Sequence, residues 1–499
     1  MKKLLSAVLV LTMLLSAVCM ASAEDKPFNG EKVVVGVVTY TGALPGMARI
    51  SEKLTEYTME KYGLAVELQC FGFADYNQSA TLMLTSGEQL DIFTALLLGY
   101  TASVNKDFTL DLEENDLMAN YGKGILANVP KDYLDAARIN GVLYGVPNMK
   151  DNAVGQSSFA IGAKYLDGIG YDYASKLADG AEIIYTDMAE INDIFAKLHE
   201  AFPDLYVFAP LSNLTQYMFY DPIGGDPYGV LLDPVNSLQV ENLFASQVFH
   251  DYCKQVYDWN QAGYISKDAL TSDVTGSQCV KAGTAMSYPT ATKPGIKAQE
   301  SGLSAQEMII FQTGADFTSS SGIAGMPWCI NSNTEIPEAA MTILDGFYSD
   351  PVMSNLLCWG EEGVEYQKME DGHITFADGI DANNSEWYTS VNWEMPNQFI
   401  AHIWNGDTLD LWERMAKFNN ESLLSKASGF TFDNSEVAAE YTALTSVYDE
   451  YITTLLFGFV DPDDAAEGIP AFVEALTKNG LDTYMAAKQT ALDAWAAAK

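Results

Sequence analysis

The chain has 499 residues, of which 48% are hydrophobic, so it can bury a large core or two lobes built from several segments. Its formal net charge is −40, from 67 acidic and 27 basic residues, and such a chain repels nucleic acid and anionic lipid. The only arginines are Arg49, Arg138 and Arg414, and because arginine is the preferred partner of phosphate and carboxylate groups, a multiply anionic ligand is disfavoured.

The N-terminus has the features of a secretory signal peptide. Lys2 and Lys3 precede an apolar stretch that ends before the small residues of Ala21-Ser22-Ala23. We therefore expect residues 1–23 to be removed and the mature chain to begin at Glu24. No later apolar run has transmembrane length; the nearest, IFTALLLGY at residues 92–100, is of strand length. The sequence predicts secretion across the cytoplasmic membrane.

Cysteine usage points to neither a disulfide framework nor a metal site. Cys19 follows Val18, which is too bulky for the usual lipid-attachment signal, so we expect an unlipidated product and keep a lipid anchor at Cys19 as the alternative. The five cysteines beyond residue 23 are odd in number and irregularly spaced, and CxxC and HExxH motifs are absent. Buried free thiols are expected, with no cofactor or metal.

The first hundred residues after the signal read as an α/β unit. KVVVGVVT (32–39) is a β-branched run typical of a strand that is buried on both faces. Apolar residues at helical spacing follow it, then a second strand at 64–73, a helix at 76–90 and a third strand at 91–98. Ligands of such folds lie beyond the carboxyl ends of the strands. The aromatic residues expected near that edge are Tyr40, Phe73 and Tyr100.

The remainder of the chain mixes strands and helices without a low-complexity linker. INGVLYGVPNMKD (139–151) predicts a hairpin followed by a change of direction, and residues 186–202 and 248–265 predict helices. TAMSYPTATKPG (284–295) predicts a strand that leads into a proline-marked crossover, and residues 321–351 predict a strand, a turn and a helix. The last hundred residues are helical. DPDDAAE (461–467) lacks the EF-hand spacing and more simply caps a helix.

Several segments together resemble the extracellular solute-binding proteins of ABC importers, sugar-type family 1. The matching segments, in chain order, are YNQSATLMLTSGEQLDIF, INGVLYGVPN, CINSNTEIPEAAMTILDGFYSDP and NLLCWGEEGVEY. The C-terminal stretch that begins at GFVDPDD is similar to a subgroup with an extended C-terminal domain, usually associated with oligosaccharide binding. The resemblance covers nearly the whole chain after the signal, and the order of the segments makes it specific.

This resemblance implies an α/β fold: a two-lobed periplasmic-binding-protein clamp of type II, with three inter-lobe crossings and a helical C-terminal extension. The expected lobe 1 comprises residues 24–148 and 289–322, and the expected lobe 2 comprises residues 149–288 and 323–499. It also implies a monomer that closes on an oligosaccharide and presents it to the permease subunits of an ABC transporter.

The segment WGEEGVEY (359–366) raises the question of catalysis. Glycosidases need two carboxyl groups that face each other across a sugar, and adjacent residues such as Glu361 and Glu362 point in different directions. A binding role, in which Glu361 accepts sugar hydroxyls and Trp359 stacks on a sugar ring, and a plain solvent-facing turn are both open. No nucleophile motif or phosphate loop is present.

Aromatic residues are the other candidates for a sugar site, because flat rings match the C–H faces of sugars. Six of the eight tryptophans fall within residues 328–412, although at least half of these six are expected in the core. NWEMPNQFIAHIW (392–404) is the segment where stacking is expected. The predicted ligand-binding residues are Tyr40, Tyr100, Tyr217, Tyr220, Trp328, Trp359, Glu361, Trp393 and Trp404.

The sequence therefore predicts a non-enzymatic binding protein that takes an oligosaccharide, and the low arginine content favours a neutral one. A peptide or an amino sugar is the alternative ligand. A secreted glycosidase or lyase, which would need a converging pair of acids, and a surface adhesion module are the alternatives from other classes.

Overall fold

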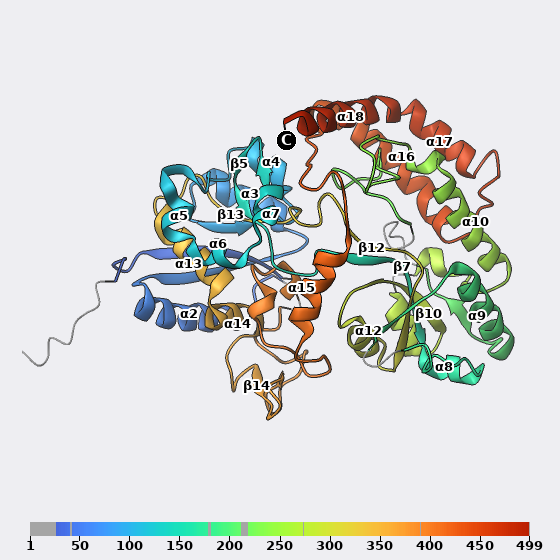
Figure 1. The fold of residues 1–499 in the computed structure, drawn as a ribbon, viewed down its shortest axis with the longest axis horizontal. Helices are drawn as coiled ribbons and strands as arrows, with labels where there is room; N and C mark the ends of the chain where they lie inside the picture. The colour runs from blue at the N-terminus through green and yellow to red at the C-terminus, as the bar shows by residue number, and fades with distance from the viewer. Residues whose placement is uncertain are drawn as a thin grey trace, which may run out of the picture.

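The computed structural model describes residues 26–39, 42–177, 181–210, 218–272, 274–389 and 391–498. Two lobes lie side by side, each with its own sheet covered by helices (Figure 1). The expected signal peptide and Cys19 lie outside the described residues. No helix among the described residues is both long and apolar enough to span a membrane.

The first lobe contains a five-stranded sheet in the order β2-β1-β3-β13-β6. β1 pairs in parallel with β2 and β3, whereas β13 runs antiparallel to β3 and β6. The predicted alternation of strands and helices at the start of the chain is confirmed, although the third strand is shorter than expected. The bounds are β1 Lys32–Thr39, α2 Met47–Lys61, β2 Ala65–Gly72, α3 Tyr76–Ser86, β3 Ile92–Thr94, β6 Gly145–Val146 and β13 Trp328–Ile330.

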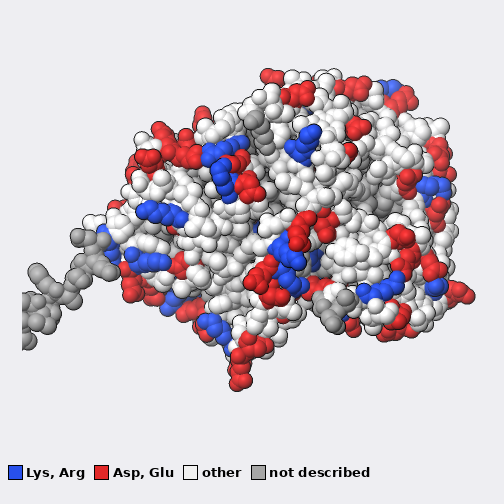
Figure 2. Space-filling view, in the orientation of Figure 1, with Lys and Arg blue, Asp and Glu red and all other residues white. Residues whose placement is uncertain are grey.

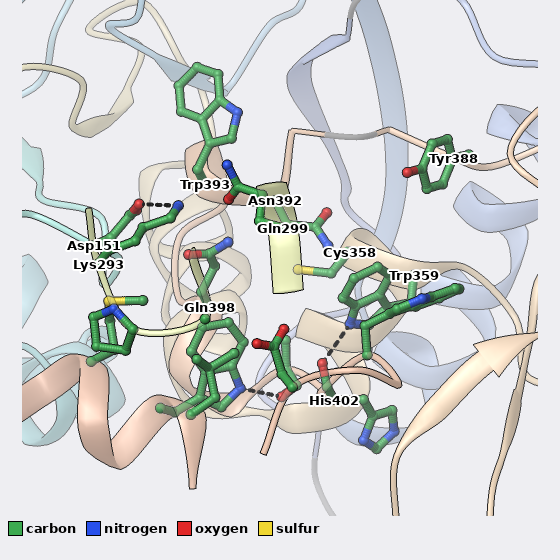
Figure 3. A pocket seen from close by; sticks show the side chains of 18 residues that line it. Asp151, Lys293, Gln299, Cys358, Trp359, Tyr388, Asn392, Trp393, Gln398 and His402 are labelled. Carbon is green, nitrogen blue, oxygen red and sulfur yellow. Dashed lines mark hydrogen bonds and ion pairs between the residues drawn. The ribbon is translucent and has the colours of Figure 1, made fainter. Parts of the chain in front are cut away.

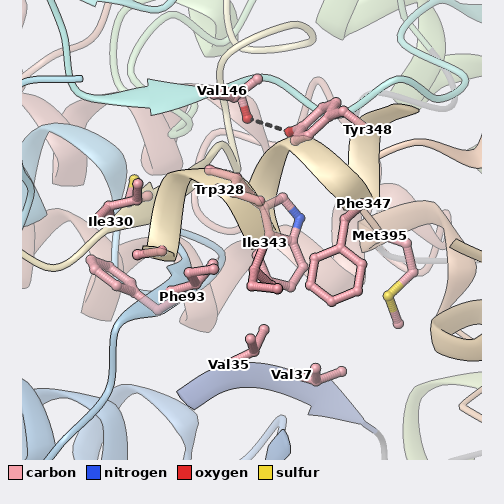
Figure 4. Packing of buried hydrophobic residues seen from close by; sticks show 14 of the residues in the cluster. Val35, Val37, Phe93, Val146, Trp328, Ile330, Ile343, Phe347, Tyr348 and Met395 are labelled. Atoms are coloured by element: carbon pink, nitrogen blue, oxygen red, sulfur yellow. Dashed lines mark hydrogen bonds between the residues drawn. The ribbon is translucent and has the colours of Figure 1, made fainter. Parts of the chain in front are cut away.

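Two helices from the middle of the chain complete this lobe and bury its sheet. Val35 and Val37 of β1 pack with Phe347 of α13 (Pro337–Ser349), and α14 (Pro351–Trp359) follows directly (Figure 4). The hydroxyl of Tyr348 donates to the carbonyl of Val146 at 2.8 Å, which ties α13 to the end of β6. The smaller elements are α4 Tyr100–Asn105, α5 Leu117–Tyr121, α6 Lys123–Asn128, α7 Lys131–Ala136, β4 Arg138–Ile139, β5 Val142–Leu143, β14 Tyr366–Lys368 and β15 Ile374–Phe376.

The second lobe contains a seven-stranded sheet centred on β7 (Val154–Gly162), which pairs antiparallel with β10, β11 and β12. Nearly every position of β7 is buried, in keeping with a central strand. The other strands are β8 Ile183–Tyr185, β9 Tyr206–Phe208, β10 Ala285–Thr292, β11 Met308–Gln312, β12 Asp316–Thr318 and β16 Leu423–Leu424.

The helices of the second lobe include the whole C-terminal extension. Phe195 of α9, Phe249 of α10, Leu444 of α16 and Phe472 of α17 belong to one buried cluster, so the extension shares the core of this lobe. The bounds are α8 Ala163–Gly168, α9 Met188–Ala201, α10 Gln247–Gln261, α11 Gly276–Ala282, α12 Ile296–Ser304, α16 Ala438–Leu456, α17 Ile469–Lys478 and α18 Leu481–Ala498.

The predicted lobe boundaries are wrong for two segments. Residues 289–322 were expected in the first lobe, but they include the end of β10 together with β11 and β12, which all pair within the second sheet. Residues 323–401 were expected in the second lobe, but they supply β13, α13 and α14 to the first. Pro289 lies inside β10, opposite Phe159, so the proline that suggested a crossover marks a strand instead.

The chain passes between the lobes at residues 147–153, 319–327 and 402–422, which gives the three expected crossings. The third crossing contains α15 (Leu411–Glu421), and this helix is hydrogen-bonded to the first crossing. The side chain of Asn419 accepts hydrogen bonds from the backbone N–H groups of Asn152 and Ala153, both at 3.0 Å.

Candidate functional site

A pocket of about 340 Å³ lies between the lobes, next to the first and third crossings (Figure 3). The first lobe contributes the end of α14 and the segment 388–404, and the second lobe contributes residues 293–299 at the start of α12. Asp151 of the first crossing and residues of α15 line it as well. Because the walls of the pocket come from both lobes and from the crossings between them, the volume of the pocket depends on the relative orientation of the lobes.

Four tryptophans line this pocket: Trp359, Trp393, Trp404 and Trp412. Each has an aromatic neighbour. The rings of Trp359 and Trp404 have centroids 5.2 Å apart, Trp412 stacks on Phe399 at 5.9 Å, and Trp393 lies 6.1 Å from Phe73.

Backbone hydrogen bonds fix two of these indoles. Trp359 Nε1 donates to the carbonyl of His402 at 3.1 Å, and Trp412 Nε1 donates to the carbonyl of Ala401 at 2.8 Å, both drawn in Figure 3. Trp359 is the last residue of α14, which ends at Gly360 with φ +84°, a conformation that favours glycine. The rings are thus held in place before any ligand arrives.

A polar wall faces the indoles. Lys293, just after β10, forms an ion pair with Asp151, with Nζ and Oδ2 2.5 Å apart. Burial alone would raise the pKa of Asp151, but Lys293 and Lys150 outweigh it and hold that pKa below its usual value. Oδ1 of Asp151 is buried and accepts no hydrogen bond from the described residues. Amide side chains complete this wall: Asn392, Gln299 and Gln398.

Asp407 is the second carboxylate that lines the pocket, and none of the described cations forms an ion pair with it. Arg414 pairs with Glu182 and with Asp410 instead, and Lys293 pairs with Asp151. Burial, followed by the charge of Glu182, raises the pKa of Asp407 to about 6.

The carboxylate of Asp407 lies against the main chain of the second lobe. A Cβ atom added at Gly295 would lie 2.7 Å from Oδ1 of Asp407, so this approach needs the glycine. Oδ1 is buried and accepts no hydrogen bond from the described residues. Burial lowers the pKa of His402, so the pocket carries two carboxylates against one ammonium near neutral pH.

Three of the predicted site residues, Trp359, Trp393 and Trp404, meet at this pocket. Three others lie in the cores and are corrected here. Trp328 is fully buried and donates from Nε1 to the carbonyl of Glu394 at 2.8 Å; Tyr100 is buried and donates to the carbonyl of Ala137. Tyr220 is buried in the second lobe. Tyr100 was expected near the cleft because it follows a strand, but its hydroxyl, like the indole N–H of Trp328, finds a backbone partner inside the first lobe. Tyr40 and Tyr217 lie outside the described residues.

Glu361 does not line the pocket and instead belongs to an ion-pair network of the first lobe, which corrects its predicted role. Its carboxylate lies 3.2 Å from Arg49 and 3.5 Å from Lys53, both on α2. Its neighbour Glu362 pairs with Lys368 at 2.7 Å. WGEEGVEY is therefore the turn between α14 and β14, and it is held to α2 by charge.

Sequence reasoning missed Asp151, Lys293, Asp407 and Trp412 as pocket residues. The signals were present in part: Asp151 ends the segment that was expected to change direction, Lys293 lies in the proline-marked segment, and Trp412 is one of the six clustered tryptophans. Nothing in the sequence marks Asp407. No group of three or more potential metal ligands is found among the described residues. Asp464 accepts from the backbone N–H groups of Ala466 and Glu467 in a turn, and the N-cap of α17 is Gly468, so DPDDAAE forms a turn and not the expected helix cap.

Comparisons with known proteins find similar sequences and a similar fold. The family described as "Domain of unknown function (DUF3502)" matches residues 426–497. A "Carbohydrate ABC transporter substrate-binding protein" of Streptococcus pneumoniae is 24% identical over 467 residues, which cover 91% of this chain and 88% of the relative.

Two solved structures of the N-glycan transport solute binding protein of the same organism also match, both at 22% identity. One, for which no bound sugar is named, superposes with a TM-score of 0.78 and covers 93% of this chain and 98% of its own. The other, titled as a complex with Man5GlcNAc, gives 0.65 and covers 94% and 98%. The shared two-lobed fold and a relative that matches over most of both chains bear out the resemblance seen in the sequence: the chain is similar to the substrate-binding proteins of carbohydrate ABC transporters.

Proposed function

We propose that the chain binds a neutral oligosaccharide between its lobes, outside the cytoplasmic membrane, and delivers it to the permease of an ABC importer. The observation that carries this proposal is the pocket between the lobes with four indoles on its walls. Indole faces supply rigid apolar area that matches the C–H faces of sugar rings, and the amides and carboxylates opposite can pair with hydroxyl groups.

The charges around the pocket favour a neutral sugar over an acidic one. Among the described residues, the one ammonium that lines the pocket, from Lys293, is already paired with Asp151, and Asp407 adds a carboxylate with which none of them forms an ion pair. A uronate or sialate would meet a net negative wall. Figure 2 shows acidic side chains spread over both lobes, which adds a long-range repulsion of anionic ligands.

An amino sugar is the second candidate, and Asp407 is the observation that favours it. A carboxylate that lacks a cation can accept a hydrogen bond from an ammonium group as well as from hydroxyls. The two candidates differ in one respect: an amino sugar would bind through charge and weaken with added salt, whereas a neutral glycan would not.

The pocket supports transport rather than hydrolysis. A glycosidase needs one carboxyl group that is free to protonate the leaving oxygen and a second that faces it across the sugar. Of the two carboxyl groups that line the pocket, Asp407 has the raised pKa of a candidate acid, but Asp151 is already paired with Lys293 and is not free to face it across a sugar as nucleophile or base. Glu361 and Glu362 are bound in ion pairs outside the pocket.

A thermal-shift screen tests this proposal on the chain from Glu24 onward. Neutral, acidic and amino oligosaccharides and a peptide set are compared, and Man5GlcNAc is included because a relative is titled as its complex. A ligand that binds only the folded state raises the midpoint, by about 2.7 kcal/mol of stability at one hundred times Kd. Mass spectrometry of the recovered glycan then separates binding from cleavage.

We expect a shift with a neutral glycan that is recovered intact, and loss of that shift in Trp404→Ala. A shift with peptides alone would keep the clamp and overturn the sugar. A shortened glycan would point to an enzyme, and binding only to immobilised polymer would point to an adhesion module.

A further inference from the structure

The C-terminal domain, defined here as residues 426–497, packs into the core of the second lobe. Lys488 of α18 is fully buried, with Nζ 2.9 Å from Oδ1 of Asp226. The hydroxyl of Tyr484 donates to Oδ2 of the same aspartate at 2.7 Å. A buried pair of this kind is costly to separate, because each charge would be left without a partner. The domain is therefore fixed to the second lobe by charge as well as by the shared core.

The start of this domain is also hydrogen-bonded to the second crossing. The N–H of Gly429 donates to the carbonyl of Ser320 at 3.1 Å. Asp221 of the second lobe, itself fully buried, accepts from the N–H of Ser320 at 2.9 Å and from its hydroxyl at 2.8 Å. Ser320 is thus held by the second lobe and by the C-terminal domain at once.

From there the domain reaches the first lobe. The side chain of Asn105, at the end of α4, donates to Oδ2 of Asp433 at 2.6 Å. Gly429 has φ +84°, and a Cβ atom added to it would lie 2.5 Å from the carbonyl oxygen of Ala136, so the two main chains touch where only glycine fits. Around these contacts lies a groove of about 840 Å³, lined by the first lobe and the C-terminal domain.

This groove and the ligand pocket lie on opposite sides of the crossings. In Figure 1, α4 and the end of α18 lie above α15 of the third crossing, and α12 lies below the chain segments that join the lobes. In a hinged clamp, a rotation that narrows one side widens the other. Closure of the pocket must therefore pull Asp433 away from Asn105 and Gly429 away from Ala136.

We propose that the C-terminal domain is a latch on the side of the crossings opposite the pocket, which holds the lobes apart through its contacts with Asn105 and Ala136 until a ligand closes them. This rests on the proposed function, because a latch has a purpose only in a clamp that closes.

The first test needs no ligand. Spin labels are placed at two exposed positions, Glu60 on α2 and Glu200 on α9, in a Cys279→Ser background, since the other described cysteines are buried. The distance between the labels is measured in the ligand-free chain by electron double resonance. Asp433→Ala should move the distribution to shorter distances, and Asp433→Asn, which still accepts from Asn105, should leave it unchanged. Identical distributions in wild type and Asp433→Ala would overturn the latch.

The second test locks the latch. The substitutions Asn105→Cys and Asp433→Cys supply two thiols that a short, reducible bis-thiosulfonate joins, and Kd for Man5GlcNAc is measured before and after reduction. We expect the cross-link to raise Kd at least about tenfold, because the competent closed state becomes scarce, and reduction to restore it. A matched cross-link between Asp193 and Lys197, both exposed on α9, should change nothing.

The two tests distinguish a failure of the latch proposal from a failure of the proposed ligand. Unchanged affinity in the cross-linked chain would contradict the latch. If Man5GlcNAc fails to bind the wild type, the choice of ligand fails, and the label distances still decide whether the latch exists. Asp433→Ala alone should tighten binding by about two- to fivefold, within what one hydrogen bond contributes.

Discussion

The rings of Trp359 and Trp404 lie with their centroids 5.2 Å apart and their planes inclined by 31° at one wall of the pocket between the lobes. Trp404 is further packed edge-on against Phe376, at 4.7 Å. Trp359 ends a helix, and Trp404 lies beside Ile374 of β15 in a bridge between the two segments. Two elements that are 45 residues apart thus present a single aromatic surface.

Trp404→Ala should remove half of that surface and weaken binding of a neutral oligosaccharide by at least about tenfold, as expected for a buried aromatic anchor. Trp404→Phe should retain part of the affinity. Isothermal titration calorimetry measures both. The matched control is Tyr185→Ala, because Tyr185 is an exposed aromatic residue on the edge of the second lobe. This variant should bind like the wild type. Wild-type affinity in Trp404→Ala would exclude stacking at this wall.

Asp407 should make binding depend on pH. With a pKa of about 6, its carboxylate is charged at pH 7.5 and mostly protonated at pH 5. The groups that act on it are Glu182, which raises this pKa, and Arg414, Lys293 and His373, which lower it. If only the charged form accepts the sugar hydroxyls, affinity should fall by about tenfold at pH 5.

Two variants and a measurement of the protons released on binding check this prediction. Asp407→Asn should bind more weakly at pH 7.5 and lose most of the pH dependence. Asp410→Asn, an exposed neighbour paired with Arg414, should keep it. Binding should release protons near pH 6, seen as a heat that varies with the buffer's ionisation enthalpy. An Asp407→Asn profile that parallels the wild type would assign the titration elsewhere.

The sequence predicted those features of the fold that local patterns encode. The β-branched run at β1 has seven buried positions out of eight, so its composition reflects burial on both faces. Which sheet a strand joins depends on partners far away in the chain. Met308–Gln312 and Trp328–Ile330 are both short buried strands, yet one pairs with β7 and the other with β3. Their local sequences cannot distinguish these destinations, which is why the lobe boundaries were misplaced.

The sequence predicted an aromatic site but not all of its residues. The clustered tryptophans predicted three residues of the pocket. Sequence alone, however, cannot distinguish a tryptophan or tyrosine in a core from one in a cleft. Trp328 satisfies its indole N–H inside the first lobe, whereas Trp359 does so at the pocket wall. Asp407 could not be found, because its significance comes from Gly295 and Glu182, which reach it from the other lobe.

Glu361 should matter for stability and not for binding. Glu361→Gln should leave sugar affinity unchanged and cost at most about 1 kcal/mol, because the carboxylate is only partly buried and shares its cations with other acids. Arg49→Met should cost more, about 2–4 kcal/mol, since it leaves Glu365, whose side chain is 3% exposed, without a cation. Urea unfolding measures both. A loss of affinity in Glu361→Gln with unchanged stability would restore it to the site.

Glu394 should make the first lobe less stable as pH rises. Its carboxyl group is fully buried, and burial raises its pKa well above the usual value. The folded chain therefore holds a proton that the unfolded chain releases near pH 4.3. The stabilisation is complete below that pH and is lost as pH rises toward the folded pKa, by about 1.4 kcal/mol per pH unit.

Glu394→Gln tests this prediction directly, because glutamine has nearly the same shape as glutamic acid and its amide does not ionise. The free energy of unfolding, measured in urea between pH 5 and 8, should fall with pH in the wild type and stay nearly level in the variant, apart from slopes that both share. Glu338→Gln, an exposed residue in the first turn of α13, should retain the wild-type slope. Parallel curves for the wild type and Glu394→Gln would mean that this carboxyl group is ionised in the folded chain, with a partner that holds it so.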